Sequence, residues 1–456
     1  MSSGRGVAAG GSRGGRDGLS STARWVVALC WIAILVEGFD VVVLGTVMPA
    51  LLDYAPWGLS PEWAGVLASL ALVGMMIGSL TVGTVTDVIG RRKSIILSVT
   101  WFSAFTALCA AAPTPELFGL FRFLSGLGLG GLLPVAATMV SEYGRTGRGG
   151  SSITFMMTGF HVGAVLTALV ALPILSAFGW RAMFVAGVLP ALVIVPLMLR
   201  HMPESPSFLL ARGRREEAEA LSVRHGIALE EQGMGNGEGA SGRFDSLRTL
   251  FAPGYLLGTL AFFAASFMGL LLVYGLNSWL PEIMNAAGYA LDTSLVSLLI
   301  LNVGAIAGLL VSGPVSDRFG SKAACAGWFA LSAVFLFLLS IRLPLTATYL
   351  LVFATGFWVF SSQVLVYAFV SKHYPAGSRG TAMGWVAGIG RLGSIAGPLM
   401  GGALVGAGLG IPWGFYAFAF VGLAGGVAVS LVPAVRRRSG GRKPAEGGLR
   451  AETARR

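Results

Sequence analysis

The segment Gly83–Lys93 reads GTVTDVIGRRK and lies between two long apolar stretches. A shorter copy, Gly313–Lys322, reads GPVSDRFGSK, and its two glycines and its aspartate are each displaced by 230 positions from those of the first copy. Such a displaced copy indicates a chain built from two similar halves. Because charged groups are costly inside lipid, we expect each copy to join two membrane-spanning helices at the bilayer surface.

The composition is that of a membrane protein. The 456 residues are 55% hydrophobic and only 12% charged, with a mean hydropathy of +0.76, whereas soluble domains carry about 25% charged residues. The net charge of +11 comes from cations in short connections rather than from a basic stripe interleaved with aromatics, so we expect no nucleic-acid partner. Cys30, Cys109 and Cys325 lack partners at metal or disulfide spacing and are interpreted as apolar fillers.

Twelve segments are apolar enough and long enough to cross a bilayer, which takes about 20 residues for about 30 Å of hydrocarbon. They predict an all-α membrane protein with six helices in each of two pseudo-repeated halves, 25–199 and 253–435. The halves are joined by a linker at 200–252, which contains a helical stretch at 212–224 and a flexible Gly-rich piece at 233–242. The expected spans are 25–51, 63–86, 94–112, 117–141, 151–177, 181–199, 254–280, 293–316, 324–342, 347–371, 380–407 and 413–434.

Basic residues set the expected orientation. Apart from two cations within spans, only Arg181 and Arg342 lie on the connections that follow odd-numbered spans. The linker and both termini, including basic tails at 1–24 and 436–456, are therefore expected in the cytoplasm. The first tail is interpreted as disordered rather than as a signal peptide. We expect a multi-pass protein of the inner (plasma) membrane.

Several of these features resemble the major facilitator superfamily. They are the twelve spans in two sets of six, the loop motif at Gly83–Lys93, its weaker repeat at Gly313–Lys322, and the Pro-Glu-Ser-Pro close of the sixth span at Pro203–Pro206. The resemblance covers nearly the whole chain. It implies a carrier whose halves rock about a central site, with the two loop motifs acting as latches.

A second set of motifs resembles the aromatic acid:proton symporter family, whose members import benzoate-type and hydroxybenzoate-type acids. The resemblance implies proton-coupled import of an aromatic carboxylate by alternating access. That family typically has two aspartates in the first-span motif, and here the first is Glu37, whose extra methylene keeps the chemistry but moves the carboxylate. The alternatives are a carrier of a sugar or another organic acid, and a membrane sensor with a carrier fold. The motifs are Glu37-Gly-Phe-Asp40 in the first span, Arg122–Gly131 and Ser141-Glu142 in the fourth, and Arg379 with Arg391 around the eleventh.

Ionisable groups within spans point to the same kind of site. At about 1.5 Å per residue, Asp40 lies ~22 Å from the inner face and Arg122 lies ~8 Å from the outer face, which is a similar depth. The two are expected to pair, and Glu37 shares the face of Asp40. We expect Asp40 and Glu37 to take up the coupled proton, since a carrier of this kind needs a titratable acid near a cation. The alternative is a static salt bridge.

Arg391 lies near the midplane of the eleventh span, where its planar, permanently charged guanidinium is suited to a substrate carboxylate. Arg122 is expected to help balance the charge of the substrate. The alternative for Arg391 is a fixed internal counter-ion. The position that precedes it by 230 residues is His161, so both halves place a cation-capable side chain at corresponding points. His161 is interpreted either as a proton carrier or as a hydrogen-bonding residue.

Polar and aromatic side chains of the second half are expected to shape the pocket. Amides can hydrogen-bond a substrate, and aromatic rings can stack on a planar one. Tryptophan and tyrosine also serve as anchors at bilayer surfaces, which is the alternative interpretation. The expected pocket residues are Asn302, Trp358, Gln363 and Tyr367.

The loop motifs are expected to close the cytoplasmic gate. Asp87 is predicted to cap the start of the eleventh helix near Thr381, and Arg91 to reach Glu142. The alternative, a purely topological role, accounts for the cations but not for the aspartate or the paired glycines. The expected gating residues are Asp87, Gly90, Arg91, Glu142, Asp317 and Arg379.

The sequence contains no phosphate-binding nucleotide loop, serine triad or metal-ligand cluster. We therefore expect no enzyme activity, no cofactor and no metal. The expected partners are a small organic anion, a proton and the lipid bilayer, and nothing in the sequence requires an oligomer.

Overall fold

The computed structural model describes residues 21–143, 149–225 and 243–433, and within these ranges the chain forms helices and no strand. The two tails at 1–20 and 434–456 and the Gly-rich piece at 233–242 lie outside the described residues. The helices are α1 (Ser21–Leu52), α2 (Pro61–Ile89), α3 (Arg91–Ala111), α4 (Pro115–Tyr143), α5 (Gly149–Phe178), α6 (Trp180–His201), α7 (Pro206–Ala211), α8 (Arg215–His225), α9 (Arg243–Leu250), α10 (Leu256–Ala286), α11 (Leu291–Phe319), α12 (Ser321–Leu338), α13 (Leu345–His373), α14 (Ala376–Gly406) and α15 (Trp413–Leu431).

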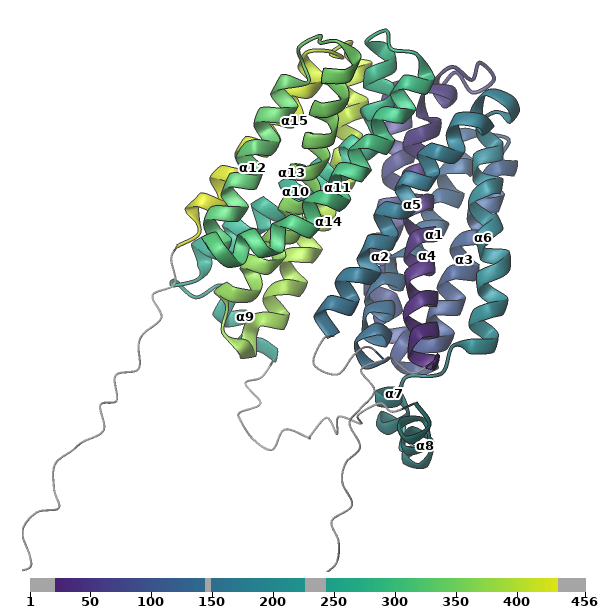
Figure 1. Cartoon of the computed structure of the whole chain (residues 1–456), viewed down its shortest axis with the longest axis vertical. Coiled ribbons are helices and arrows are strands. Elements are labelled where there is room, and N and C mark those ends of the chain that lie inside the picture. The colour runs from purple at the N-terminus through teal and green to yellow at the C-terminus, as the bar shows by residue number, and fades with distance from the viewer. Residues whose placement is uncertain (1–20, 144–148, 226–242, 434–456) are drawn as a thin grey trace, which may run out of the picture.

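The twelve long helices form two groups of six, α1–α6 and α10–α15, which lie side by side (Figure 1). The short helices α7–α9 lie at the end where α1 begins and α15 ends, and we call this the linker end and the other the distal end. Eleven of the long helices are long and apolar enough to cross a membrane, and the arginine-containing α14 is the twelfth. The predicted twelve-helix membrane fold is confirmed.

The sequence repeat is also a repeat of helix packing. α2 packs on α4 in the first half as α11 packs on α13 in the second. A Cβ added at Gly78 would lie 2.2 Å from the carbonyl oxygen of Leu127, and one at Gly308 would lie 2.1 Å from that of Phe357. Both glycines and both carbonyls are related by the displacement of 230 positions. Small residues allow membrane helices to approach this closely, so each half depends on the same close crossing.

The loop motifs end and begin helices in the same way. Gly90 closes α2 and opens α3 with φ of 95°, and Gly320 closes α11 and opens α12 with φ of 87°. Only glycine adopts such angles without strain, because it has no Cβ. The paired glycines therefore provide the sharp turn that joins two spanning helices in each half.

The two halves pack together at the distal end and diverge toward the linker end (Figure 1). At the distal end, α2 packs on α14, and the Ser69 hydroxyl donates to the carbonyl oxygen of Ile395 at 2.9 Å. A second seam joins α5 to α11, and α1 packs on α10 between the two seams. Nearer the linker end of α14, a Cβ added at Gly384 or Gly388 would meet no atom within 4 Å. The halves are therefore less closely packed at the linker end than at the distal end.

Some element boundaries differ from those expected. α1 begins at Ser21, inside the segment predicted as a disordered tail. The helical stretch predicted at 212–224 is α8, Arg215–His225. α10 continues to Ala286, past Pro281 and the expected end at 280, because neighbouring helices compensate the backbone groups that a proline frees in a membrane helix.

Candidate functional site

Ionisable and polar side chains from both halves meet near the middle of the bundle. Glu37 lies near the centre of α1, His161 near that of α5 and Arg391 at the centre of α14. Glu37 and His161 are buried, whereas Arg391 is partly exposed. The sequence predicted this depth for all three, and the structure adds which of them interact.

Asp40 and Arg122 form a buried ion pair within the first half. A guanidinium nitrogen of Arg122 lies 2.9 Å from Oδ2 of Asp40, and the other terminal nitrogen donates to the Asp40 carbonyl oxygen at 3.1 Å. The hydroxyls of Thr106 and Ser125 also donate to the Asp40 carboxylate. Both charged residues are almost fully buried, at 2% and 1% exposure. The pairing expected from their depths is present, and it leaves Asp40 surrounded by donors.

Glu37 has a different environment, one turn away on the same helix. Its Oε2 is buried and has no hydrogen-bond partner among the described residues. Its carboxyl group interacts electrostatically with Arg391 of the second half, and with Asp40. Arg391 also interacts with the hydroxyl of Tyr274. Glu37 and Arg391 therefore interact across the halves without forming a direct ion pair, and Glu37 keeps one oxygen without a hydrogen-bond partner among the described residues.

The charges of this site balance only while no further ion is present. Two carboxylates and two guanidiniums lie close together, and an anion that entered would leave one negative charge uncompensated in a region of low dielectric. Protonation of the unpaired carboxyl group of Glu37 would restore neutrality. The arrangement can thus hold a carboxylate together with a proton.

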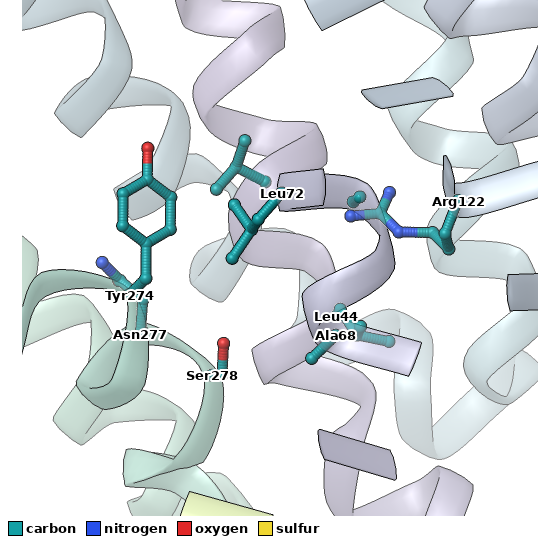
Figure 2. Close-up of a pocket in the computed structure, with 9 residues that line it drawn as sticks. Leu44, Ala68, Leu72, Arg122, Tyr274, Asn277 and Ser278 are labelled. Atoms are coloured by element: carbon teal, nitrogen blue, oxygen red, sulfur yellow. The ribbon is translucent and has the colours of Figure 1, made fainter. Parts of the chain in front are cut away.

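A pocket lies between α1, α2, α4 and α10. Arg122 points toward it from one side, and Tyr274, Asn277 and Ser278 line the opposite side (Figure 2). The rest of its wall is apolar, and consists of Val41, Leu44, Ala68, Ala71 and Leu72. Apolar walls with a few polar groups are typical of sites for small organic ligands. In this conformation the enclosed space holds only about one water molecule.

The buried amide side chains of Asn302 and Gln363 hydrogen-bond residues of α10, which lines the pocket. The Asn302 amide nitrogen donates to Oδ1 of Asn277 at 3.1 Å, and His161 of the first half interacts with Asn302. On α13, the Gln363 amide donates to the Ser266 hydroxyl at 3.1 Å, and its own Oε1 has no partner among the described residues. Asn302 and Gln363 thus both lie buried against α10.

The two remaining predicted pocket residues, Tyr367 and Trp358, lie in different surroundings. Tyr367 lies close enough to Tyr274 to interact with it electrostatically. Trp358 instead packs edge-on against Trp328, with ring centroids 4.8 Å apart, and stacks on Phe335. Both partners belong to α12, so Trp358 packs within the second half and we leave it out of the proposed binding site.

At the linker end, the first loop motif packs on the segment that follows α6. The Glu204 side chain accepts from the backbone nitrogen of Arg92 at 3.0 Å and would clash with any Cβ at Gly90. The Arg91 guanidinium lies 5.5 Å from the ring centroid of Phe208. The side chain of Asp87 lies outside the described part of the structure, so its predicted capping contact stays a prediction.

Glu142 was predicted as the partner of Arg91. Its carboxylate accepts hydrogen bonds from the hydroxyls of Ser205 and Ser207, at the start of α7. In the second half, Asp317 pairs with Lys372 at 2.9 Å, and both side chains are more than half exposed. An exposed pair contributes little stability. Arg379 is exposed in the first turn of α14.

Sequence reasoning missed the hydroxyls that hold Asp40 and the role of Glu204. Thr106 and Ser125 lie inside apolar spans, where serine and threonine commonly bond the backbone of their own helix, so their presence does not indicate a site. Glu204 belongs to the Pro-Glu-Ser-Pro motif, but only the fold places it against Gly90.

The fold and this central site together define a membrane carrier built from two repeated halves. The sequence profile of the Major Facilitator Superfamily matches residues 30–386 and 300–455. The chain belongs to this superfamily, and it is a multi-pass membrane transporter rather than an enzyme.

Individual known proteins are similar over almost the full length. A gentisate transporter of Corynebacterium glutamicum is 34% identical over 91% of this chain and 88% of its own. A benzoate transport protein of Acinetobacter baylyi is 31% identical over 89% of each chain. The crystal structure of a D-xylose-proton symporter has the same fold, with a TM-score of 0.72 at 20% identity over 91% of this chain and 98% of that one.

Proposed function

We propose that this transporter is a symporter that imports an aromatic carboxylate together with a proton. The observation that carries the proposal is the electrostatic interaction across the halves between Arg391 and Glu37, whose buried Oε2 has no hydrogen-bond partner among the described residues. A guanidinium matches a carboxylate, and an unpaired buried carboxyl group is suited to carry a proton. Relatives named for the transport of gentisate and benzoate, both aromatic carboxylates, support this substrate class.

In the proposed cycle, Glu37 takes a proton from the outer side and the substrate carboxylate then binds Arg391. Protonation frees Arg391 from its electrostatic partner, so the anion replaces the ionised carboxylate and the site stays neutral. Asp40 is proposed to take part in proton coupling through its ion pair with Arg122, and both residues belong to the proposed site. The further proposed binding residues are Gln363, Tyr367 and Asn302.

The linker end is proposed to face the cytoplasm of a cell whose inner (plasma) membrane holds the protein. Basic residues concentrate in the connections at this end, which supports that orientation. The divergence of the halves at this end (Figure 1) would allow substrate to leave inward. In the opposite state, contacts among Asp87, Gly90, Arg91 and Glu142 in the first half, and Asp317 and Arg379 in the second, are proposed to hold this end closed.

Uptake by cells tests the proposal. Cells that express the protein should accumulate labelled 4-hydroxybenzoate above the external concentration, and a protonophore should abolish the accumulation, because the proton gradient is the proposed energy source. Vector-only cells are the control. A sensor would bind the acid without accumulating it, an exporter would lower its internal level, and a sugar carrier would ignore it. Any of these three results would contradict the proposal.

A further inference from the structure

A chain of polar side chains crosses the seam between the halves at mid-depth. The Asn302 amide nitrogen donates both to Oδ1 of Asn277 and to the carbonyl oxygen of Leu298, each at 3.1 Å. These two bonds fix the orientation of the amide. Its Oδ1 is then left without a hydrogen-bond partner among the described residues, although Asn302 is fully buried. The unsatisfied atom is therefore an acceptor.

His161 approaches Asn302 from the other half. The two side chains interact, but Nδ1 of His161 makes no hydrogen bond that meets normal geometry within the described structure. The imidazole is 9% exposed, and its edge packs on Phe360 with ring centroids 5.4 Å apart. Leaving a buried polar atom without its bond costs about 1–3 kcal/mol. Each half therefore contributes one buried polar atom without a partner among the described residues, and the two side chains that carry these atoms interact across the seam.

We propose that a hydroxyl group on the substrate ring binds between Asn302 and His161, so that these residues select hydroxylated aromatic acids. This inference rests on the proposed function. A hydroxyl both donates and accepts, so it can donate to Oδ1 of Asn302 and accept from the His161 ring N–H. An unsubstituted ring leaves both atoms unpaired, which is how a polar site rejects an analogue that lacks the hydroxyl.

The placement of the two seams restricts the position of the hydroxyl. Arg391, which binds the carboxylate, belongs to α14 in the seam with α2, whereas Asn302 and His161 lie in the separate seam between α11 and α5. The ring must therefore bridge from one seam to the other. A hydroxyl at position 3 or 4 points away from the carboxylate and meets this requirement. A hydroxyl at position 2 lies beside the carboxylate and does not.

The bridge also connects the halves. His161 belongs to the first half and Asn302 to the second, so a bound hydroxyl holds the two together at this depth. Asn277 acts as a positioning residue, because it holds the amide of Asn302 in the orientation that presents Oδ1.

Affinities of the purified full-length protein for benzoate and for 2-, 3- and 4-hydroxybenzoate test the inference. The wild type should bind 3- or 4-hydroxybenzoate at least ~10-fold more tightly than benzoate or 2-hydroxybenzoate. Asn302→Leu should reduce this preference to less than ~3-fold, because the ring hydroxyl loses a partner that benzoate never uses. Ser297→Ala is the matched control: Ser297 is buried on the same helix, and its hydroxyl bonds Thr293 of that helix.

A second variant guards against misfolding. His161→Phe keeps a ring at this position but removes the N–H. It should also reduce the preference for 3- or 4-hydroxybenzoate over benzoate. A preference retained in either variant overturns the inference, as does a parallel loss for benzoate and 4-hydroxybenzoate. A wild type that binds benzoate and all three hydroxybenzoates equally overturns it while the proposed function stands. A wild type that binds none of the four acids overturns both.

Discussion

Arg391→Gln is expected to lower the affinity for 4-hydroxybenzoate by at least ~30-fold, since breaking a buried charge-assisted pair costs about 2–5 kcal/mol or more. The planar guanidinium is the group proposed to bind the carboxylate. Its loss also leaves Glu37 facing no cation from the second half, which favours the protonated acid and removes the attraction for an anion. Arg391→Lys keeps the charge but not the two-pronged geometry, so an intermediate affinity is expected.

Binding of labelled substrate to purified protein measures this effect. Arg342→Gln is the matched control. Arg342 is an exposed arginine that lies outside the long helices, in the connection before α13. If Arg391→Gln bound the acid as tightly as Arg342→Gln does, Arg391 would be a fixed counter-ion and not a substrate ligand.

Asp40→Asn is expected to destabilise the folded protein by about 3–5 kcal/mol, as removal of one partner of a buried ion pair does. The amide keeps the shape of the carboxylate but leaves the Arg122 guanidinium charged and only 1% exposed. Asp40→Asn combined with Arg122→Gln removes both charges and should recover much of the loss.

The melting temperature in detergent reports the difference. Asp53→Asn changes an exposed aspartate just beyond the end of α1 and serves as the control. A single Asp40→Asn variant that melts with the wild type and with Asp53→Asn would show that the pair does not hold the first half together.

The fold was predictable because its strongest signals are local. Long apolar segments mark the spans whatever their neighbours are, and the turn glycines Gly90 and Gly320 allow a positive φ that other residues adopt only with strain. The pair formed by Asp40 and Arg122 was also predictable, since depth follows from counting residues along two helices that belong to the same half.

Contacts between the halves could not be predicted in this way. The approach of Glu37 to Arg391, and of His161 to Asn302, depends on how each helix is rotated and on how the halves are tilted. Counting residues fixes neither. Trp358 is a further example. Its depth along α13 follows from the sequence, but the side chain lies on a face of the helix that packs on Trp328 of α12.

The contacts of the predicted gating residues also depend on the conformation. Glu142 bonds Ser205 and Ser207 in this structure, in which the halves diverge at the linker end. The contacts proposed to close this end belong to the other state. A motif does not indicate in which state its residues make a given contact.

Proton movement in sealed liposomes, measured with an internal pH dye while labelled 4-hydroxybenzoate is counted, tests the central claim most directly. With an acid exterior, wild-type protein should acidify the interior in step with uptake and accumulate the acid above its external concentration. Glu37→Gln should lose the acidification and the accumulation while still exchanging internal for external substrate. Substrate-dependent acidification that persists in Glu37→Gln, or wild-type uptake without proton entry, would contradict the account.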